Sequence, residues 1–199
     1  MVPLTKSSQS GRILKQPHLL AAILCCMTAA TLLWRTCEPA ECQTRAVIAV
    51  RSADFANGSS IPPRYTCDGT NLSPQLEWQI PPIGAKSLAL VMDDPDAPSD
   101  FVHWIVYNIP PGVQQLSEGA SPHGSLPAGS QEETNGFSHS EYGGPCPPHG
   151  VHRYFFRLYA LDLRLDLPAG ATRQQLEAAM NGHILAQGQL VGTYQRSVH

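Results

Sequence analysis

The chain has 199 residues, of which 42% are hydrophobic and 15% are charged, so it can form one domain with a real core and is too apolar to be disordered. Its 18 prolines and 16 glycines favour many short strands and turns over long helices. Residues 47–199 hold eight Lys and Arg against fourteen Asp and Glu, a net charge of −6. Such an acidic domain is a poor candidate for binding nucleic acid or anionic lipid, so local hydrogen-bond donors must hold any anion that it binds.

The first 46 residues have the features of a targeting segment. An uncharged apolar run, residues 19–34, follows three basic residues. The run is shorter than the roughly 20 residues that span a bilayer, and it suits the core of a signal peptide. Thr44 and Ala46 are small residues that predict cleavage after Ala46, whereas an uncleaved anchor flanked by Arg35 is the main alternative and a buried core helix is a third. We therefore expect an exported protein, periplasmic or secreted, or one anchored in a membrane through residues 19–34.

Four of the six cysteines lie in that segment, which leaves Cys67 and Cys146 in the domain. Cys37 and Cys42 lack the apolar and small neighbours that precede a lipid-modified cysteine. In an oxidising compartment, Cys67 and Cys146 are candidates for a disulfide that closes a loop of about 80 residues and adds roughly 4 kcal/mol of stability in the chain-entropy model. Two buried free thiols are the alternative.

The domain, residues 47–199, contains no internal repeat, and its pattern predicts strands with one or two short helices. Alternating or continuous apolar residues predict strands at Val47–Val50, Leu76–Trp78, Ser87–Met92, Phe101–Ile109, Arg153–Leu161 and Ile184–Tyr194. Thr172 is expected to cap a helix that runs to about Met180 and stops at Asn181-Gly182. The predicted fold class is mainly β, with a β-sandwich as the leading architecture.

The first of three polar motifs is DDPDAP, residues 93–98, which places three carboxylates directly after a predicted buried strand. Its alternate prolines fix the backbone and can hold carboxylates where they would otherwise repel each other. Taken alone, the motif is more often an ordinary acidic turn.

The second motif is His103 within the apolar strand at 101–109, where a buried imidazole needs a polar partner. With a period of two residues, His103 is expected to share a face with Ile105 and Tyr107, and Trp104 is expected to lie on the opposite face. Taken alone, His103 is more often a core histidine with a satisfied hydrogen bond.

The third motif is YGGPCPPHGVHRY, residues 142–154, where a loop rich in glycine and proline leads into a strand. The glycines let the backbone approach a ligand, and the prolines stiffen the loop. His152 and Tyr154 lie two residues apart and are expected to face the same side. Taken alone, this motif is interpreted as a surface loop rich in proline and glycine. Together, the three motifs place acids, imidazoles and a phenol at strand ends that can converge in one cleft.

These motifs resemble the phosphatidylethanolamine-binding protein family, in its bacterial branch often called Raf-kinase-inhibitor-like. The similarity covers residues 47–199 in order and rests on YTCDGTNLSPQLEW at 65–78, DDPDAP at 93–98, HWIVYNIP at 103–110, YGGPCPPHGVHRYFFRLYALD at 142–162 and NGHILAQGQLVGTY at 181–194. The resemblance implies a β-sandwich with a small cavity for phosphate, acetate or phosphoryl head groups.

Carried over by motif, the ligand-binding residues would be Asp94, Asp96, Ala97, His103, Gly144, Pro145, His152 and Tyr154, with Asp96 supporting the loop. The loop at 143–151 departs from the eukaryotic pattern by an inserted Cys-Pro, so the resemblance does not assign backbone donors within it. The C-terminal helix of the eukaryotic members is not evident, which leaves their inhibitor role in doubt for this chain.

The predicted function is non-catalytic binding of a small anionic or phosphoryl-type ligand, without a cofactor or metal and with a regulatory role as one option. His103, His152 and Tyr154 would donate hydrogen bonds, and Asp94 is expected to raise the pKa of both imidazoles, so affinity should increase as the pH falls. The Asp94 carboxylate also favours a monoanion, a zwitterionic head group or a shared proton.

Two other classes of function remain open. One is a metal-dependent hydrolase that uses the cluster of Asp and His residues, although the sequence contains neither an HExxH motif nor a Gly-x-Ser-x-Gly nucleophile elbow. The other is a module that binds a partner protein through a phosphorylated or acidic segment. The sequence does not identify such a partner.

Overall fold

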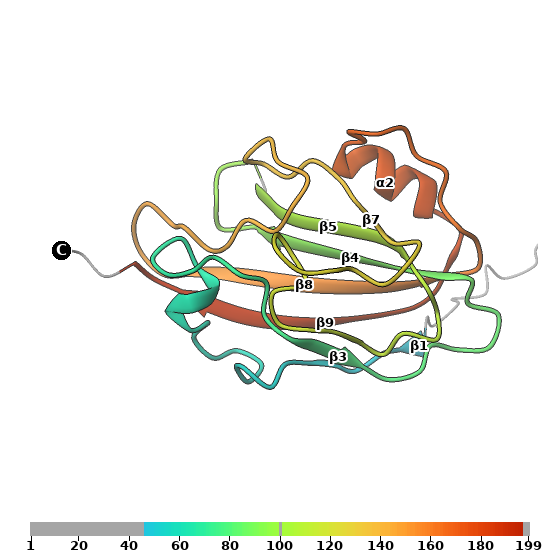
Figure 1. The fold of residues 1–199 in the computed structure, drawn as a ribbon, viewed down its shortest axis with the longest axis horizontal. Helices are drawn as coiled ribbons and strands as arrows, with labels where there is room; N and C mark the ends of the chain where they lie inside the picture. Colours follow the sequence, from blue (N-terminus) through green and yellow to red (C-terminus); the bar gives the residue numbers. More distant parts are fainter. Residues whose placement is uncertain (1–45, 100, 197–199) are drawn as a thin grey trace, which may run out of the picture. The chain divides into compact units, whose positions relative to one another are not determined.

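Two β-sheets of unequal size face each other across the core, and one helix covers the outer face of the larger sheet (Figure 1). The computed structural model describes residues 46–99 and 101–196. The predicted leader or anchor lies outside these residues. Within them, no helix has the length and apolar character needed to cross a membrane.

The larger sheet has six strands in the order β1-β9-β8-β4-β5-β7. Its neighbours pair antiparallel, except that β1 runs parallel to β9. In spatial order the strands are β1 Ala46–Val47, β9 Ile184–Tyr194, β8 His152–Leu161, β4 Ser87–Asp94, β5 Phe101–Ile109 and β7 Gln131–Glu132.

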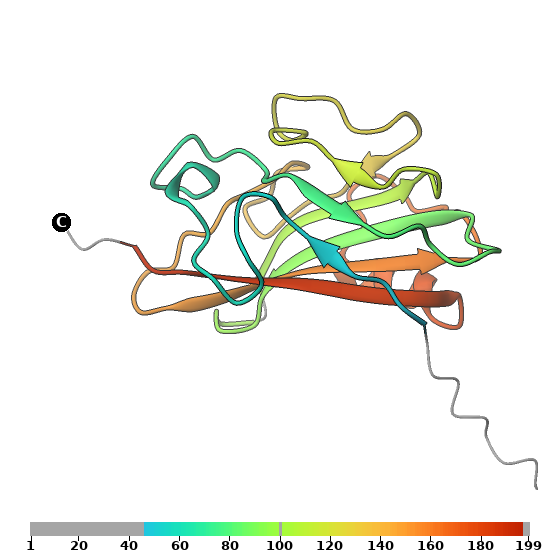
Figure 2. The ribbon, with the colours of Figure 1, turned by 90° about the horizontal axis from the view of Figure 1, so that it is seen from below.

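The smaller sheet crosses one face of the larger sheet (Figure 2). It has the order β2-β3-β6, with β2 at Val50–Arg51, β3 at Leu76–Trp78 and β6 at Gln115–Leu116. A 3-10 helix, η2, spans Pro63–Tyr65, and the one α-helix of the described residues, α2, spans Arg173–Met180.

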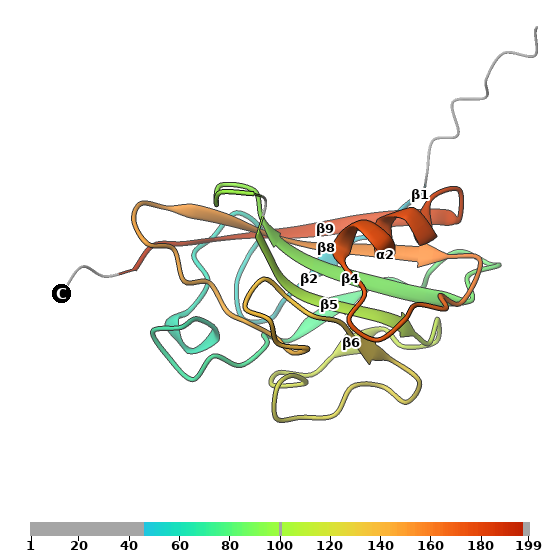
Figure 3. The same cartoon turned by 90° about the horizontal axis from the view of Figure 1, so that it is seen from above.

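Strand β4 is buried on both faces of the larger sheet. Leu90 and Met92 pack into the core between the sheets, whereas Ala89 and Val91 pack under α2. A strand buried on both faces reads as a continuous apolar run, which explains the sequence SLALVM. Figure 3 shows α2 lying over the outer face of this sheet.

The predicted β-sandwich is confirmed, and so are most of the expected elements. Strands β3, β5 and β9 and helix α2 have the predicted bounds, and Thr172 caps α2 through a capping box with Gln175. The predicted first strand is instead two short strands, because β1 pairs with the large sheet and β2 with the small one. Strand β4 also runs two residues further than predicted, to Asp94, so Asp93 and Asp94 belong to the strand rather than to a loop.

A bulge in β5 overturns the predicted orientation of His103. Met92 of β4 lies opposite Trp104, but Asp93 lies opposite Val102, so His103 is the extra residue of the bulge. Ile105 packs under α2, as a period of two residues predicts. The bulge, however, turns the His103 ring toward the other face, where it contacts Tyr154 of β8.

The two cysteines of the domain, Cys67 and Cys146, form the predicted disulfide. The bond joins the segment after η2 to the loop that precedes β8. Because both cysteines are bonded, the alternative of two free thiols is not the structure observed.

Candidate functional site

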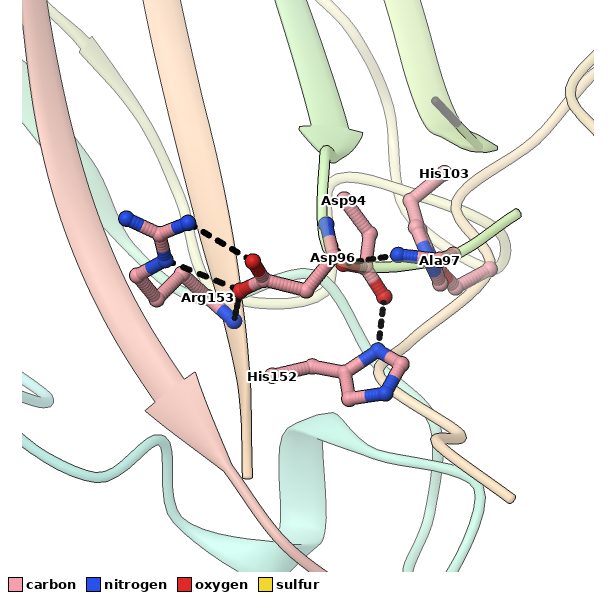
Figure 4. Close-up of polar contacts among 7 residues, drawn as sticks. Asp94, Asp96, Ala97, His103, His152 and Arg153 are labelled. Atoms are coloured by element: carbon pink, nitrogen blue, oxygen red, sulfur yellow. Dashed lines mark hydrogen bonds and ion pairs between the residues drawn. The ribbon is translucent and has the colours of Figure 1, made fainter. Parts of the chain in front are cut away.

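A cavity of about 210 Å³ lies where β4 ends and where β5 and β8 begin. Figure 4 shows the polar side chains that gather there from these three strands. The residues that line it are Asp94, Ala97, Pro98, Phe101, His103, Phe137, Cys146, Pro147, Pro148, His152 and Tyr154. Five of the eight predicted ligand-binding residues are among them, namely Asp94, Ala97, His103, His152 and Tyr154.

Asp94 is the centre of the polar network, and its side chain is buried. Its Oδ1 accepts hydrogen bonds from the backbone N–H groups of Asp96, at 2.9 Å, and Ala97, at 3.1 Å. Its Oδ2 lies 2.7 Å from Nδ1 of His152 (Figure 4). A carboxylate accepts only, so the His152 proton sits on Nδ1 and orients the ring. No described residue forms a hydrogen bond with Nε2 of His152, and the residue lines the cavity.

Asp96 lies outside the cavity and holds the DDPDAP loop against β8. Its carboxylate accepts from the Arg153 backbone N–H and Nε, both at 2.9 Å, and from an Arg153 terminal nitrogen at 2.6 Å (Figure 4). The side-chain hydrogen bond from Arg153 is the main reason why the pKa of Asp96 falls to about 2. Asp96 therefore supports the loop rather than facing a ligand.

His103 is 3% exposed, and its Nδ1 lies 2.7 Å from the carbonyl oxygen of Gly143. A carbonyl only accepts, so Nδ1 carries the proton and the neutral ring has a lone pair on Nε2. Burial lowers the pKa of His103, and it outweighs the opposing effects of the Gly143 carbonyl and the Asp94 carboxylate. Asp94 thus acts on this imidazole in the predicted direction, but its effect is smaller than that of burial and the net pKa is lowered.

Tyr154 is fully buried, and its hydroxyl has no hydrogen-bond partner among the described residues. Burial raises its pKa, and the nearby Asp94 carboxylate adds to the effect. The hydroxyl therefore keeps its proton and is available as a donor at the cavity wall. Its ring packs edge-on against His103, with the centroids 5.1 Å apart.

An aromatic wall, which the sequence motifs did not reveal, closes the cavity beside His103. Phe101 and Phe137 pack edge-on against each other, with centroids 4.8 Å apart, and both contact the His103 ring. Asn135 positions the Phe137 loop, because its Oδ1 accepts from Phe137 N and its Nδ2 donates to Glu141 O. The bulge in β5 brings in Phe101, but Phe137 comes from a loop without any periodic signal.

Gly144 and Pro145, both predicted to bind the ligand, do not line the cavity and instead fix the loop beside it. The Gly144 N–H donates to Asn71 Oδ1 at 2.8 Å, and a Cβ at Gly144 would lie 2.4 Å from the Tyr65 carbonyl oxygen. The Pro145 carbonyl accepts from Cys67 N at 3.1 Å. The inserted Cys146 and Pro147 form the wall in their place.

The polar groups do not form a metal centre in the part of the chain that the structure describes. No group of three or more His, Cys, Asp or Glu side chains there is arranged to hold a metal ion. The Asp94 and Asp96 carboxylates are already bonded to backbone N–H groups, to His152 and to Arg153. These bonds do not favour the metal-dependent hydrolase.

Comparisons with known proteins agree with this geometry. The family model described as phosphatidylethanolamine-binding protein matches residues 51–195. A UPF0098 protein of Methanothermobacter thermautotrophicus is 52% identical over 143 residues, which cover 71% of this chain and 95% of that protein. LppC of Mycobacterium tuberculosis, a candidate lipoprotein, is 42% identical over 74% of this chain and 72% of its own length.

Among solved structures, Escherichia coli YbcL, a member of the mammalian PEBP family, is 31% identical with a TM-score of 0.72, over 76% of this chain and 100% of that chain. The PEBP homologue CT736 of Chlamydia trachomatis is 39% identical with a TM-score of 0.69, over 76% of this chain and 99% of that chain. From its sequence and its fold, the chain belongs to the phosphatidylethanolamine-binding protein family.

Proposed function

We propose that the cavity binds a small anionic or phosphoryl-type group and does not catalyse a reaction on it. The observation that carries this proposal is the buried Tyr154 hydroxyl, which has no partner among the described residues. Leaving a buried hydroxyl unsatisfied costs about 1–3 kcal/mol, and a ligand oxygen at this position recovers that cost.

The size and lining of the cavity restrict the ligand. At about 210 Å³ the cavity is smaller than the roughly 300–1,000 Å³ that hold drug-sized molecules, so it accepts a head group rather than a whole large ligand. Besides Asp94, the polar side-chain groups of the cavity are the Tyr154 hydroxyl and the ring nitrogens of His103 and His152. Phe101 and Phe137 supply an apolar wall for a short carbon substituent.

Attraction to an anion has to be local, because the domain carries a net charge of −6. Two cations beside the DDPDAP motif are already paired, because Arg153 is bonded to Asp96 and Arg157 to Asp93. Hydrogen bonds from the side chains of His152 and Tyr154 therefore have to hold the anion, because no excess of basic residues attracts it.

We also propose that the protein works outside the cytoplasm, as an exported or membrane-anchored protein. The Cys67–Cys146 disulfide fits an oxidising compartment, and the relative LppC is a candidate lipoprotein.

The cavity lies far from the start of the domain. Ala46 pairs with Ala186, and His152 at the cavity pairs with Tyr194, eight residues further along β9. At about 3.3 Å per residue, the cavity lies roughly 26 Å along the strand from the point where residues 1–45 join the domain.

Calorimetry with methyl phosphate as the probe tests the binding function. Tyr154→Phe keeps the ring but removes the unpartnered hydroxyl, so affinity should fall about tenfold while the melting temperature stays the same or rises. Tyr142→Phe is the matched control, because the Tyr142 hydroxyl donates to the Tyr65 carbonyl and does not line the cavity. That variant should lose stability and keep its affinity. Equal affinity in Tyr154→Phe and the unaltered protein would contradict the proposal.

A further inference from the structure

We propose that the cavity selects a phosphoryl ligand that still carries a proton, with His103 accepting that proton's hydrogen bond. This inference rests on the proposed binding function and adds to it the ligand's protonation state. It changes the role expected of His103 from a donor to an acceptor.

The tautomer of His103 is fixed by geometry. The 2.7 Å contact to the Gly143 carbonyl requires an N–H at Nδ1, so Nε2 of the neutral ring has only a lone pair to offer. The carbonyl is itself held in place, because Gly143 N donates to the His103 carbonyl at 3.0 Å. Two hydrogen bonds therefore join His103 to the loop that contains Gly143.

The surroundings keep the ring neutral. Phe101, Phe137 and Tyr154 all pack edge-on against the ring, and none of these carries a charge. The charged or titratable groups that face His103 are Asp94 from β4 and His152 and Tyr154 from β8. Burial is the largest effect and outweighs the opposing effects of Asp94 and of the Gly143 and Gly144 carbonyls, so the His103 pKa is lowered and protonation does not convert Nε2 into a donor near neutral pH.

The buried Tyr154 hydroxyl and the His103 ring therefore require different groups on one ligand. Tyr154 donates and needs an oxygen with a lone pair, whereas Nε2 of His103 accepts and needs a ligand O–H. The Asp94 carboxylate beside them repels a second negative charge. A phosphate monoester with one proton supplies the oxygen, the O–H and the single charge. Its dianion lacks the O–H, and a sulfate monoester has the same shape and charge as the monoanion but no proton to donate.

The test compares methyl phosphate with methyl sulfate, by calorimetry or by displacement, from pH 5 to pH 8. At pH 5 methyl phosphate should bind about tenfold more tightly, which corresponds to the loss of one hydrogen bond to Nε2 of His103 when methyl sulfate is bound instead. Because its second pKa is about 6, only about 1% of it is singly protonated at pH 8. The ratio of the two affinities should therefore fall by about a hundredfold over this range.

The outcomes separate the two proposals. If both ligands bind with a ratio that does not change with pH, the role of His103 is overturned while the binding function stands. If neither ligand binds at any pH, the binding function fails as well. In His103→Phe, which keeps an aromatic ring and lacks Nε2, the ratio at pH 5 should approach one, and in Tyr142→Phe it should stay unchanged. If His103→Phe does not fold, the comparison of the two ligands on the unaltered protein still tests whether the cavity selects the protonated phosphate.

Discussion

His103 and Gly143 are joined by two hydrogen bonds, one from the ring Nδ1 to the Gly143 carbonyl and one from Gly143 N to the His103 carbonyl. These bonds attach the loop before β8 to the start of β5, at the bulge that turns the ring toward the cavity. The cavity wall and the sheet are therefore parts of one structure, and changes to this pair should alter stability and binding together.

The first prediction concerns the pH dependence of stability. Because folding lowers the His103 pKa below its ordinary value of 6.5, the unfolded chain takes up the proton first as the pH falls. The contribution of His103 is thus fully present above pH 6.5 and is lost as the pH falls toward its folded pKa. Thermal denaturation between pH 7.5 and pH 5 should show a smaller loss on acidification in His103→Phe than in the unaltered protein. An identical loss in both would contradict the prediction.

The second prediction concerns the support of the DDPDAP loop. The Asp96 pKa is lowered to about 2, so its pairing with Arg153 stabilises the fold above pH 4 and is lost as the pH falls from 4 to 2. Asp96→Asn should be less stable than the unaltered protein at pH 5, and the difference should vanish near pH 2. Urea denaturation at several pH values measures this. Since Asp96 does not line the cavity, methyl phosphate affinity should fall severalfold at most.

The sequence predicts more of the fold than of the site. Strands such as β5 and β9 follow from apolar runs of the right length, and α2 follows from its cap at Thr172. The bulge at His103 does not follow, because it depends on how β4 pairs with β5 and leaves no mark in the local pattern. A local period of two residues therefore gave the wrong face for the central histidine.

Some residues of the cavity follow from the sequence motifs, and others depend on tertiary contacts. Asp94, His152 and Tyr154 come from motifs at strand ends and line the cavity as predicted. Gly144 was predicted as a ligand residue, but its neighbour Tyr65 packs so closely that the glycine is needed for loop packing. Phe137 was missed, because only the tertiary contact with Phe101 and His103 brings its loop to the cavity.

The third prediction concerns the disulfide. Cys67 is exposed, so a reductant can reach the bond, and Cys146 lines the cavity. Reduction should cost about 4 kcal/mol of stability in the chain-entropy model, for a sequence separation of 79 residues, and should weaken methyl phosphate binding. Thermal denaturation and calorimetry with and without dithiothreitol measure both effects. Cys67→Ser should already show both losses and should not respond to the reductant; a response there would point to another target.

The fourth prediction concerns the aromatic wall. Phe137 is 41% exposed, so Phe137→Ala removes less buried area than truncation of a core phenylalanine, and it also removes the edge contacts to Phe101 and His103. Such contacts are worth about 0.5–1.5 kcal/mol, so methyl phosphate affinity should fall roughly 2- to 10-fold, with a small change in melting temperature. Val151→Ala is the matched control, because Val151 is also exposed and does not line the cavity. Equal affinities for the two variants would show that the wall does not take part in binding.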